Sequence, residues 1–167
     1  KRPTVVNMSW GYSFSSSATP TVGNYRGNAW TYGDSGYASS AELYANAGIV
    51  PAYFSGSTRK IGSRLTSVDT DVQEMIDAGI HICIAAGNSF YYIDNANGQD
   101  YNNTVTISGS TRSYHQGSSP FDDEAFIVGN IDIDYTNNLE NKAGSSCCGP
   151  GVNIYAPGTQ IMSASSN

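Results

Sequence analysis

The fold is decided by residues 68–88, whose sequence is VDTDVQEMIDAGIHICIAAGN. Apolar residues recur at helical spacing in the first half of this stretch, and Gly79 stands where a left-handed residue commonly ends a helix. Thr70 and Gln73 match a capping box, in which two side chains satisfy free backbone donors at a helix start. The pattern predicts one amphipathic helix from about Asp69 to Ala78.

A buried strand is expected directly after this helix. Ile80–Ala86 has the apolar content and length of a central strand, and the Gly-Asn-Ser sequence at 87–89 breaks it. Thr4–Ser9 predicts a buried parallel strand upstream, and the order strand, helix, strand implies a right-handed crossover. Ala125–Gly129 and Val152–Gly158 predict two further strands. The fold class is therefore α/β with a parallel sheet.

The stretch from Ser13 to about Lys60 is rich in Ser, Gly, Tyr and Ala. It predicts a long insertion with one short helix over Ser40–Ala47, closed by Gly48. Residues 1–167 are otherwise expected to form a single domain, because a chain of this length can bury a substantial core. The chain starts without a methionine, so we expect it to be a piece of a longer protein or a processed product.

The charge balance excludes some partners. Eight basic against fourteen acidic residues give a formal charge of −6, which disfavours a nucleic acid or an anionic membrane surface. No segment has the length and apolarity of a membrane span. Charged residues make up only 13% of the chain, a composition that predicts a secreted, extracellular or virion-associated protein.

The sequence predicts no required metal or cofactor. Cys83 reads as a small buried apolar residue, a disulfide between adjacent Cys147 and Cys148 would need a strained ring, and no cysteines have zinc spacing. One oxygen-rich stretch offers ligands that calcium prefers, although a solvated loop explains it as well. Its residues are Asp94, Asn95, Asn97 and Asp100.

Three blocks carry a resemblance to a known family. Val5–Gly11 ends in Ser-Trp-Gly, and Val68–Asn88 ends in Ala-Ala-Gly-Asn. Phe126–Gly129, the Ser-rich turn at Ala143–Ser146 and the Ala-Pro-Gly segment at Ala156–Gly158 form the third block. In this order the blocks resemble the middle portion of the subtilisin-like serine proteases (subtilases). The resemblance covers about two-thirds of the chain and leaves 13–60 and parts of 90–121 unmatched.

The resemblance implies a substrate-binding site. It assigns Asn88 as the side-chain donor to the oxyanion of peptide hydrolysis, a contribution of roughly 3–4 kcal/mol in such enzymes. It also implies two walls of a pocket for the P1 side chain, with main-chain groups that pair with an extended peptide. One wall consists of Ala85, Ala86 and Gly87, and the other of Ser9, Trp10 and Gly11. Trp10 stands where many relatives have a smaller aliphatic residue.

The resemblance also implies what this chain lacks. The family's catalytic Asp and His would precede Lys1, and its Ser would follow Asn167. The implied fold is an incomplete three-layer subtilisin-like domain that contains the central and C-terminal part of the sheet. We therefore expect a segment of a serine endopeptidase that is inactive alone and has the rest of the protease domain as its partner.

Other interpretations stay open at this stage. His81 reads as a sheet histidine and His115 as a loop residue rather than as a general base. A non-catalytic subtilase-like module of a virion or cell surface would keep the scaffold without the triad. A carbohydrate-binding or adhesion domain would instead use the aromatic insertion, because tyrosine combines apolar area with a polar tip.

Overall fold

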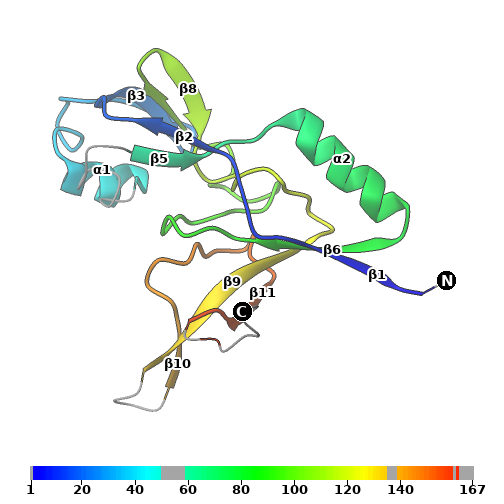
Figure 1. Ribbon diagram of the computed structural model, residues 1–167. Coiled ribbons are helices and arrows are strands. Elements are labelled where there is room, and N and C mark those ends of the chain that lie inside the picture. The colour runs from blue at the N-terminus through cyan, green and yellow to red at the C-terminus, as the bar shows by residue number, and fades with distance from the viewer. Residues whose placement is uncertain (1, 50–58, 135–138, 160, 162–167) are drawn as a thin grey trace.

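A computed structural model describes residues 2–49, 59–134, 139–159 and 161. Its largest sheet, here the main sheet, has the order β1-β6-β9-β10, with β11 also paired to β9 (Figure 1). The pairs β1/β6, β6/β9 and β9/β11 are parallel, and β9/β10 is antiparallel. The strands are β1 (Thr4–Met8), β6 (Ile80–Ala85), β9 (Phe126–Asp134), β10 (Leu139–Lys142) and β11 (Ile154–Pro157). The predicted α/β class is confirmed.

Helix α2 (Thr66–Asp77) follows β5 (Arg59–Gly62) and precedes β6 in the chain, and it lies over one side of the main sheet (Figure 1). The predicted capping box is wrong, because the helix begins one turn earlier. Leu65 is the N-cap and has no side-chain cap bond, while the Thr70 hydroxyl donates to the Thr66 carbonyl inside the helix at 2.9 Å. The predicted end is confirmed by Gly79, whose φ is +81°.

Helix α1 (Ser40–Ala47) has the bounds that the sequence predicts. The Ser39 hydroxyl accepts a hydrogen bond from the Glu42 amide at 3.2 Å, and the Glu42 carboxylate accepts one from the Ala38 amide at 2.7 Å. Gly48 ends the helix with a φ of +65°. This helix therefore has the reciprocal N-terminal bonding that α2 lacks.

The two helix starts give a paired prediction on stability. Ser39→Ala should lower the free energy of unfolding by about 1 kcal/mol, because an amide at the helix start loses its acceptor. Thr70→Ala should change it by only a few tenths of a kcal/mol, because the hydroxyl bonds a carbonyl that already serves the helix. Urea unfolding followed by circular dichroism measures both. A larger loss for Thr70→Ala than for Ser39→Ala would contradict the assigned caps.

The main sheet has one covered and one open face. Paired residues of parallel strands share a face, and the covered face carries Met8 with Ile84, and Ile84 with Ile127. All three side chains are buried, together with Val72 of α2. The open face carries apolar side chains with large exposed fractions, namely Val5 (63%), Phe126 (49%) and Ile154 (51%). Thr4–Ser9 is thus an edge strand whose residues are mostly exposed, which corrects the prediction of a buried strand.

The insertion contains strands that the sequence did not predict. Two of them, β2 (Ser13–Ser16) and β5 (Arg59–Gly62), pair antiparallel with each other. A separate four-stranded sheet, here the accessory sheet, has the order β4-β3-β7-β8. Its strands are β3 (Pro20–Tyr25), β4 (Asn28–Thr31), β7 (Thr104–Ile107) and β8 (Ser110–Ser113). Half of this sheet therefore comes from the insertion and half from the stretch after β6.

Both hairpins of the accessory sheet turn through two residues with positive φ. These are Arg26 (51°) and Gly27 (83°) in one hairpin, and Ser108 (52°) and Gly109 (76°) in the other. Such turns match the right-handed twist of the strands they join. Among the described residues, no helix has the length and apolar character required to cross a membrane.

Candidate functional site

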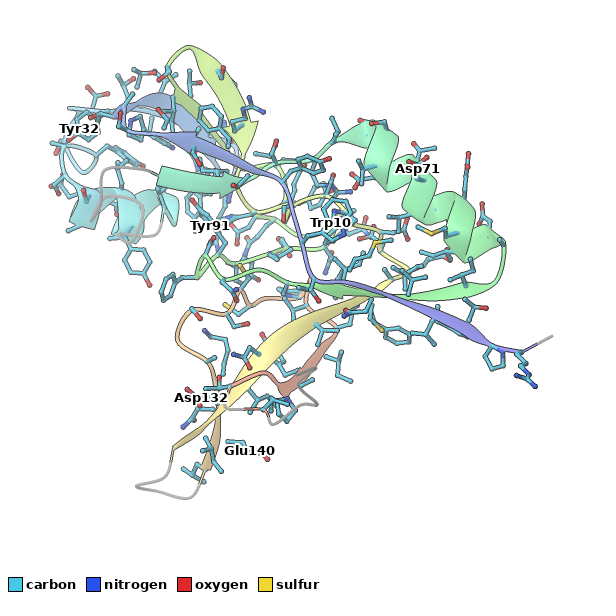
Figure 2. The ribbon with its side chains drawn as sticks, in the orientation of Figure 1. Trp10, Tyr32, Asp71, Tyr91, Asp132 and Glu140 are labelled. Atoms are coloured by element: carbon cyan, nitrogen blue, oxygen red, sulfur yellow. The ribbon has the colours of Figure 1, made fainter. Side chains whose placement is uncertain are left out.

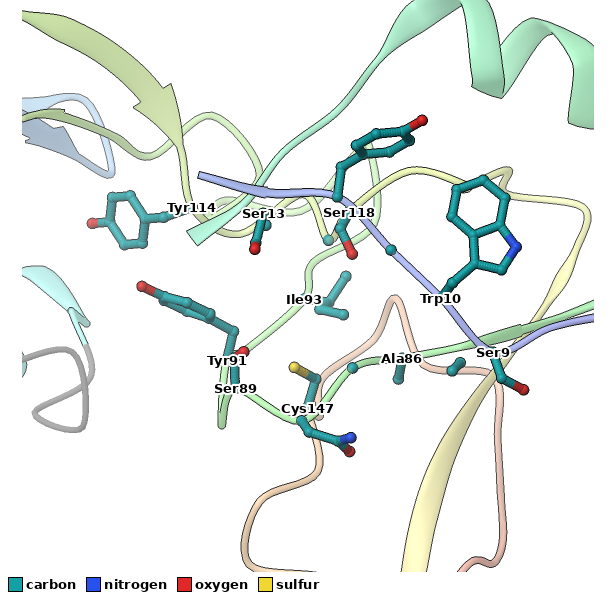
Figure 3. Close-up of a pocket in the computed structure, with 17 residues that line it drawn as sticks. Ser9, Trp10, Ser13, Ala86, Ser89, Tyr91, Ile93, Tyr114, Ser118 and Cys147 are labelled. Carbon is teal, nitrogen blue, oxygen red and sulfur yellow. The ribbon is translucent and has the colours of Figure 1, made fainter. Parts of the chain in front are cut away.

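A pocket of about 260 Å³ opens at the ends of β1 and β6, between the main sheet and the strand pair β2–β5, which contributes Ser13 and Gly62 (Figure 3). Figure 2 places Trp10 and Tyr91, which both line it, near the middle of the molecule. All seven residues that the sequence assigned to substrate binding or catalysis line this pocket. They are Ser9, Trp10, Gly11, Ala85, Ala86, Gly87 and Asn88.

Strand register explains why these two segments meet. In the parallel pair of β1 and β6, Met8 lies opposite Ile84. The carboxyl ends of both strands therefore reach the same edge of the sheet, where open α/β sheets commonly bind ligands. Residues 9–11 and 85–88 leave the sheet together and diverge around the pocket.

The turn after β6 presents the Asn88 side chain to solvent. Gly87 has a φ of +101°, a conformation that side chains with a Cβ rarely adopt. The Gly87 carbonyl accepts a hydrogen bond from the Cys147 amide at 3.0 Å, and the Ala86 amide donates to the Val128 carbonyl at 2.9 Å. Asn88 itself is exposed, and its carboxamide makes no hydrogen bond within the described part of the chain. Its amide group is thus available as a donor on a turn that is fixed from both sides.

The opposite wall is an exposed aromatic rim. Trp10 and Tyr12 are 51% and 44% exposed, and their rings meet edge to face with centroids 5.7 Å apart. A Cβ on Gly11 would lie 2.8 Å from the Ser118 hydroxyl oxygen, so a larger residue there would require the Ser118 side chain to move. The Tyr12 amide donates to the Ser119 carbonyl at 2.9 Å, which ties the chain to the protein beyond Gly11.

The inner wall consists of residues that sequence reasoning did not assign. Ile93 and Cys147 lie between Trp10 on one side and Tyr91 and Tyr114 on the other (Figure 3). All of these except Trp10 are buried. Burial raises the pKa of the Cys147 thiol, which keeps it protonated at neutral pH. The one available sequence signal was the Ser-rich turn at 143–146, which ends next to Cys147.

A second hollow of about 500 Å³ lies along the same edge of the main sheet. It shares Ser9, Ala85, Gly87 and Asn88 with the pocket. The middle of β9 and the end of β11 complete it, through residues such as Val128, Asn130 and Gly158. Asn88 therefore stands where the two hollows meet, within reach of groups that enter from either one.

The oxygen-rich stretch is a bonded loop. Asp94 and Asp100 are only 3% and 5% exposed, which corrects the interpretation of a solvated loop for these two residues. The Asp94 carboxylate accepts hydrogen bonds from the Asn95 and Asp100 amides at 3.0 and 2.8 Å. Asp100 forms an ion pair with Arg26 at 2.7 Å. Within the ranges that the structure describes, no group of three or more His, Cys, Asp or Glu side chains is arranged to hold a metal ion.

The two histidines and Cys83 do not line the pocket. His81 is exposed on the open face of β6, and Cys83 on that face is half-buried, which corrects its prediction as a buried residue. All three cysteines are free thiols. His115 follows β8 in a loop, as predicted, but its side chain is only 3% exposed.

Comparisons with known proteins give this chain no relative. Models of known protein families, curated protein sequences and solved structures were each searched, and no match was found in any of the three. The chain is therefore placed by its class alone, a mixed α/β protein with a cleft at the carboxyl edge of its main sheet.

Proposed function

We propose that this chain supplies the substrate-binding walls and the oxyanion donor of a subtilisin-like serine endopeptidase. The observation that supports this most is the free carboxamide of Asn88, which borders a pocket between two parallel strand ends. A fixed donor of this kind stabilises the negative charge that develops on the carbonyl oxygen during peptide hydrolysis. The enzyme would act outside the cell.

The substrate in this proposal is an extended peptide with a neutral P1 residue. None of the 17 residues that line the pocket is Asp, Glu, Lys, Arg or His. A charged P1 side chain would lose water without gaining a partner, which is unfavourable. The main chain of residues 9–11 is the segment that would pair with the peptide, because Tyr12 is already bonded to Ser119.

The catalytic Asp, His and Ser belong, in this proposal, to parts of the polypeptide beyond residues 1–167. The second hollow suits their approach, because it reaches Asn88 from the side opposite to the pocket. The chain by itself would bind substrate without hydrolysing it, since nucleophile and base are both required for covalent catalysis.

The proposal is tested on the polypeptide that carries both flanks. We expect an upstream Asp and a His-Gly-Thr sequence, a downstream Gly-Thr-Ser, and cleavage of a peptide series that favours neutral P1 residues over Lys and Asp. A fluorophosphonate reagent should label the downstream serine and stop cleavage. If the flanks lack one of these residues and the reagent labels no serine, the proposal fails and the chain is part of a non-catalytic module instead.

A further inference from the structure

A buried polar network lies behind the pocket wall, and the proposed function does not use it. The Arg26 guanidinium forms a two-point ion pair with Asp100, at 2.7 and 2.8 Å. The Asn103 amide nitrogen donates to Asp100 at 2.8 Å and contacts the His115 Nδ1 at 3.0 Å. Asn103 and His115 are 1% and 3% exposed, so the network is shielded from water at this end.

The direction of these hydrogen bonds is set by the backbone. The Arg26 amide donates to the Asn103 side-chain oxygen at 2.7 Å, which fixes the orientation of the carboxamide. Both hydrogens of the Asn103 nitrogen are then used, one on Asp100 and one on His115. The His115 Nδ1 must therefore accept a hydrogen bond, so the ring is neutral and carries its hydrogen on Nε2.

A proton on His115 would break this arrangement. A hydrogen on Nδ1 would point at the hydrogens of the Asn103 side-chain nitrogen. Turning the Asn103 carboxamide over would not help, because its NH₂ group would then face the Arg26 amide hydrogen and its oxygen would face the Asp100 carboxylate. The Nε2 atom is buried and has no hydrogen-bond partner among the described residues. Protonation thus removes the hydrogen bond from Asn103 and buries a positive charge, which the nearby main-chain groups of Asp100 and Gly48 favour too weakly to offset.

His115 is in contact with the pocket wall through Tyr114. The two rings have centroids 4.4 Å apart, and the Tyr114 amide donates to the Asn103 carbonyl at 3.3 Å. The Tyr114 hydroxyl donates to the Ala47 carbonyl at the end of α1. Tyr114 itself is buried and lines the pocket. Two of its contacts, with the His115 ring and with Asn103, thus belong to the network that holds His115.

We propose that His115 is a positioning residue that holds Tyr114 in the pocket wall while neutral and releases it when protonated. Charged and titratable groups surround the ring on several elements. They are Tyr25 and Arg26 on the β3–β4 hairpin, Tyr92, Asp94 and Asp100 in the loop before β7, and Tyr114. The inference does not depend on the chain being part of a peptidase.

The direction of the pH response follows from burial. Burial lowers the pKa of His115 below its usual value of 6.5; the carboxylates of Asp100 and Asp94 and main-chain groups of Asp100 and Gly48 oppose this but do not offset it. The unfolded chain therefore takes up the proton more readily than the folded one. Stability is complete above pH 6.5 and falls below it, until the folded-state pKa is reached.

The experiment compares amide hydrogen exchange at pH 7.5 and pH 5.0, expressed as protection factors. We expect protection at Arg26 and Tyr114 to fall by up to about tenfold per pH unit below 6.5, and to stay lower than protection at Ile84 at both pH values, because a local opening exposes them without unfolding the main sheet. An NMR titration of the wild-type rings should show His115 protonating below pH 6.5. His115→Asn keeps an acceptor near the Nδ1 position but cannot titrate, so its protection factors should not change with pH.

His81→Gln is the matched control, because His81 is the only other histidine of the chain and is exposed. This variant should retain the wild-type response to pH. Three results would overturn the inference: His115 titrating at or above pH 6.5, protection at Tyr114 that stays constant while His115 becomes protonated, or protection at Tyr114 equal to that at Ile84, which would mean that only global unfolding exposes Tyr114. If His115→Asn fails to fold, the wild-type titration and exchange data decide alone.

Discussion

Asn88→Ala is expected to lower the turnover number of the flanked polypeptide by roughly 100- to 1,000-fold, with little change in KM. The carboxamide is exposed and free, so it can donate to an oxygen that becomes negative only in the transition state. An interaction made only there lowers kcat and leaves substrate binding almost unchanged. Steady-state kinetics on a peptide with a neutral P1 residue measure both constants.

Asn88→Asp separates the hydrogen-bond donor from the shape of the side chain. It keeps nearly the same volume and removes the N–H groups, so its loss of turnover should equal or exceed that of Asn88→Ala. Asn102→Ala is the matched control, since Asn102 is exposed and lies outside both hollows. An unchanged turnover number for both Asn88 variants would remove Asn88 from the reaction. A higher KM with constant turnover would instead make it a ground-state binding group.

Local patterns in the sequence predicted the elements that position this site. The end of β6 at Ala85 follows from an apolar run that a Gly-Asn turn interrupts. The bounds of α1 follow from a serine cap and a terminal glycine, two signals that act within a few residues. Because β1 and β6 are parallel and in register, two correctly placed strand ends were sufficient to bring the predicted residues into one pocket.

Long-range contacts account for what the sequence did not reveal. Strand β3 pairs with β7, about 80 residues further along the chain, and neither strand has a long apolar run. The start of α2 depends on the Ser119 hydroxyl, which accepts from the Leu65 amide at 2.6 Å. The Arg64–Asp69 ion pair at 2.8 Å supports the same turn. The Ser119 contact comes from 54 residues further along the chain, so no pattern within residues 64–73 reveals it and the capping box there was misleading.

The buried wall was missed for a related reason. Tyr91, Tyr114 and Cys147 come from three separate loops, and only the tertiary fold brings them to one pocket. Tyr91 and Tyr114 lie outside the insertion, and neither was assigned a role from the sequence. Their exposed fractions of 4% and 3% make the two tyrosines part of the core.

Ile84→Ala and Val5→Ala form a second pair with a large expected difference. Ile84 is 2% exposed on the covered face of the main sheet, so its truncation leaves a cavity and should lower the free energy of unfolding by about 2–5 kcal/mol. Val5 is 63% exposed on the open face, and Val5→Ala should change it by less than about 0.5 kcal/mol. Urea unfolding of both variants under identical conditions measures the difference.

The result for Val5 also tests whether the open face is free in the whole protein. Parallel sheets usually have both faces covered, and Val5, Phe126 and Ile154 are the kind of apolar residues that such a cover buries. A loss of 1–2 kcal/mol for Val5→Ala in the flanked polypeptide, but not in residues 1–167, would mean that the flanks pack on this face. A loss of about 1–2 kcal/mol in both would contradict the exposure described here, because truncating a solvated valine removes almost no buried surface.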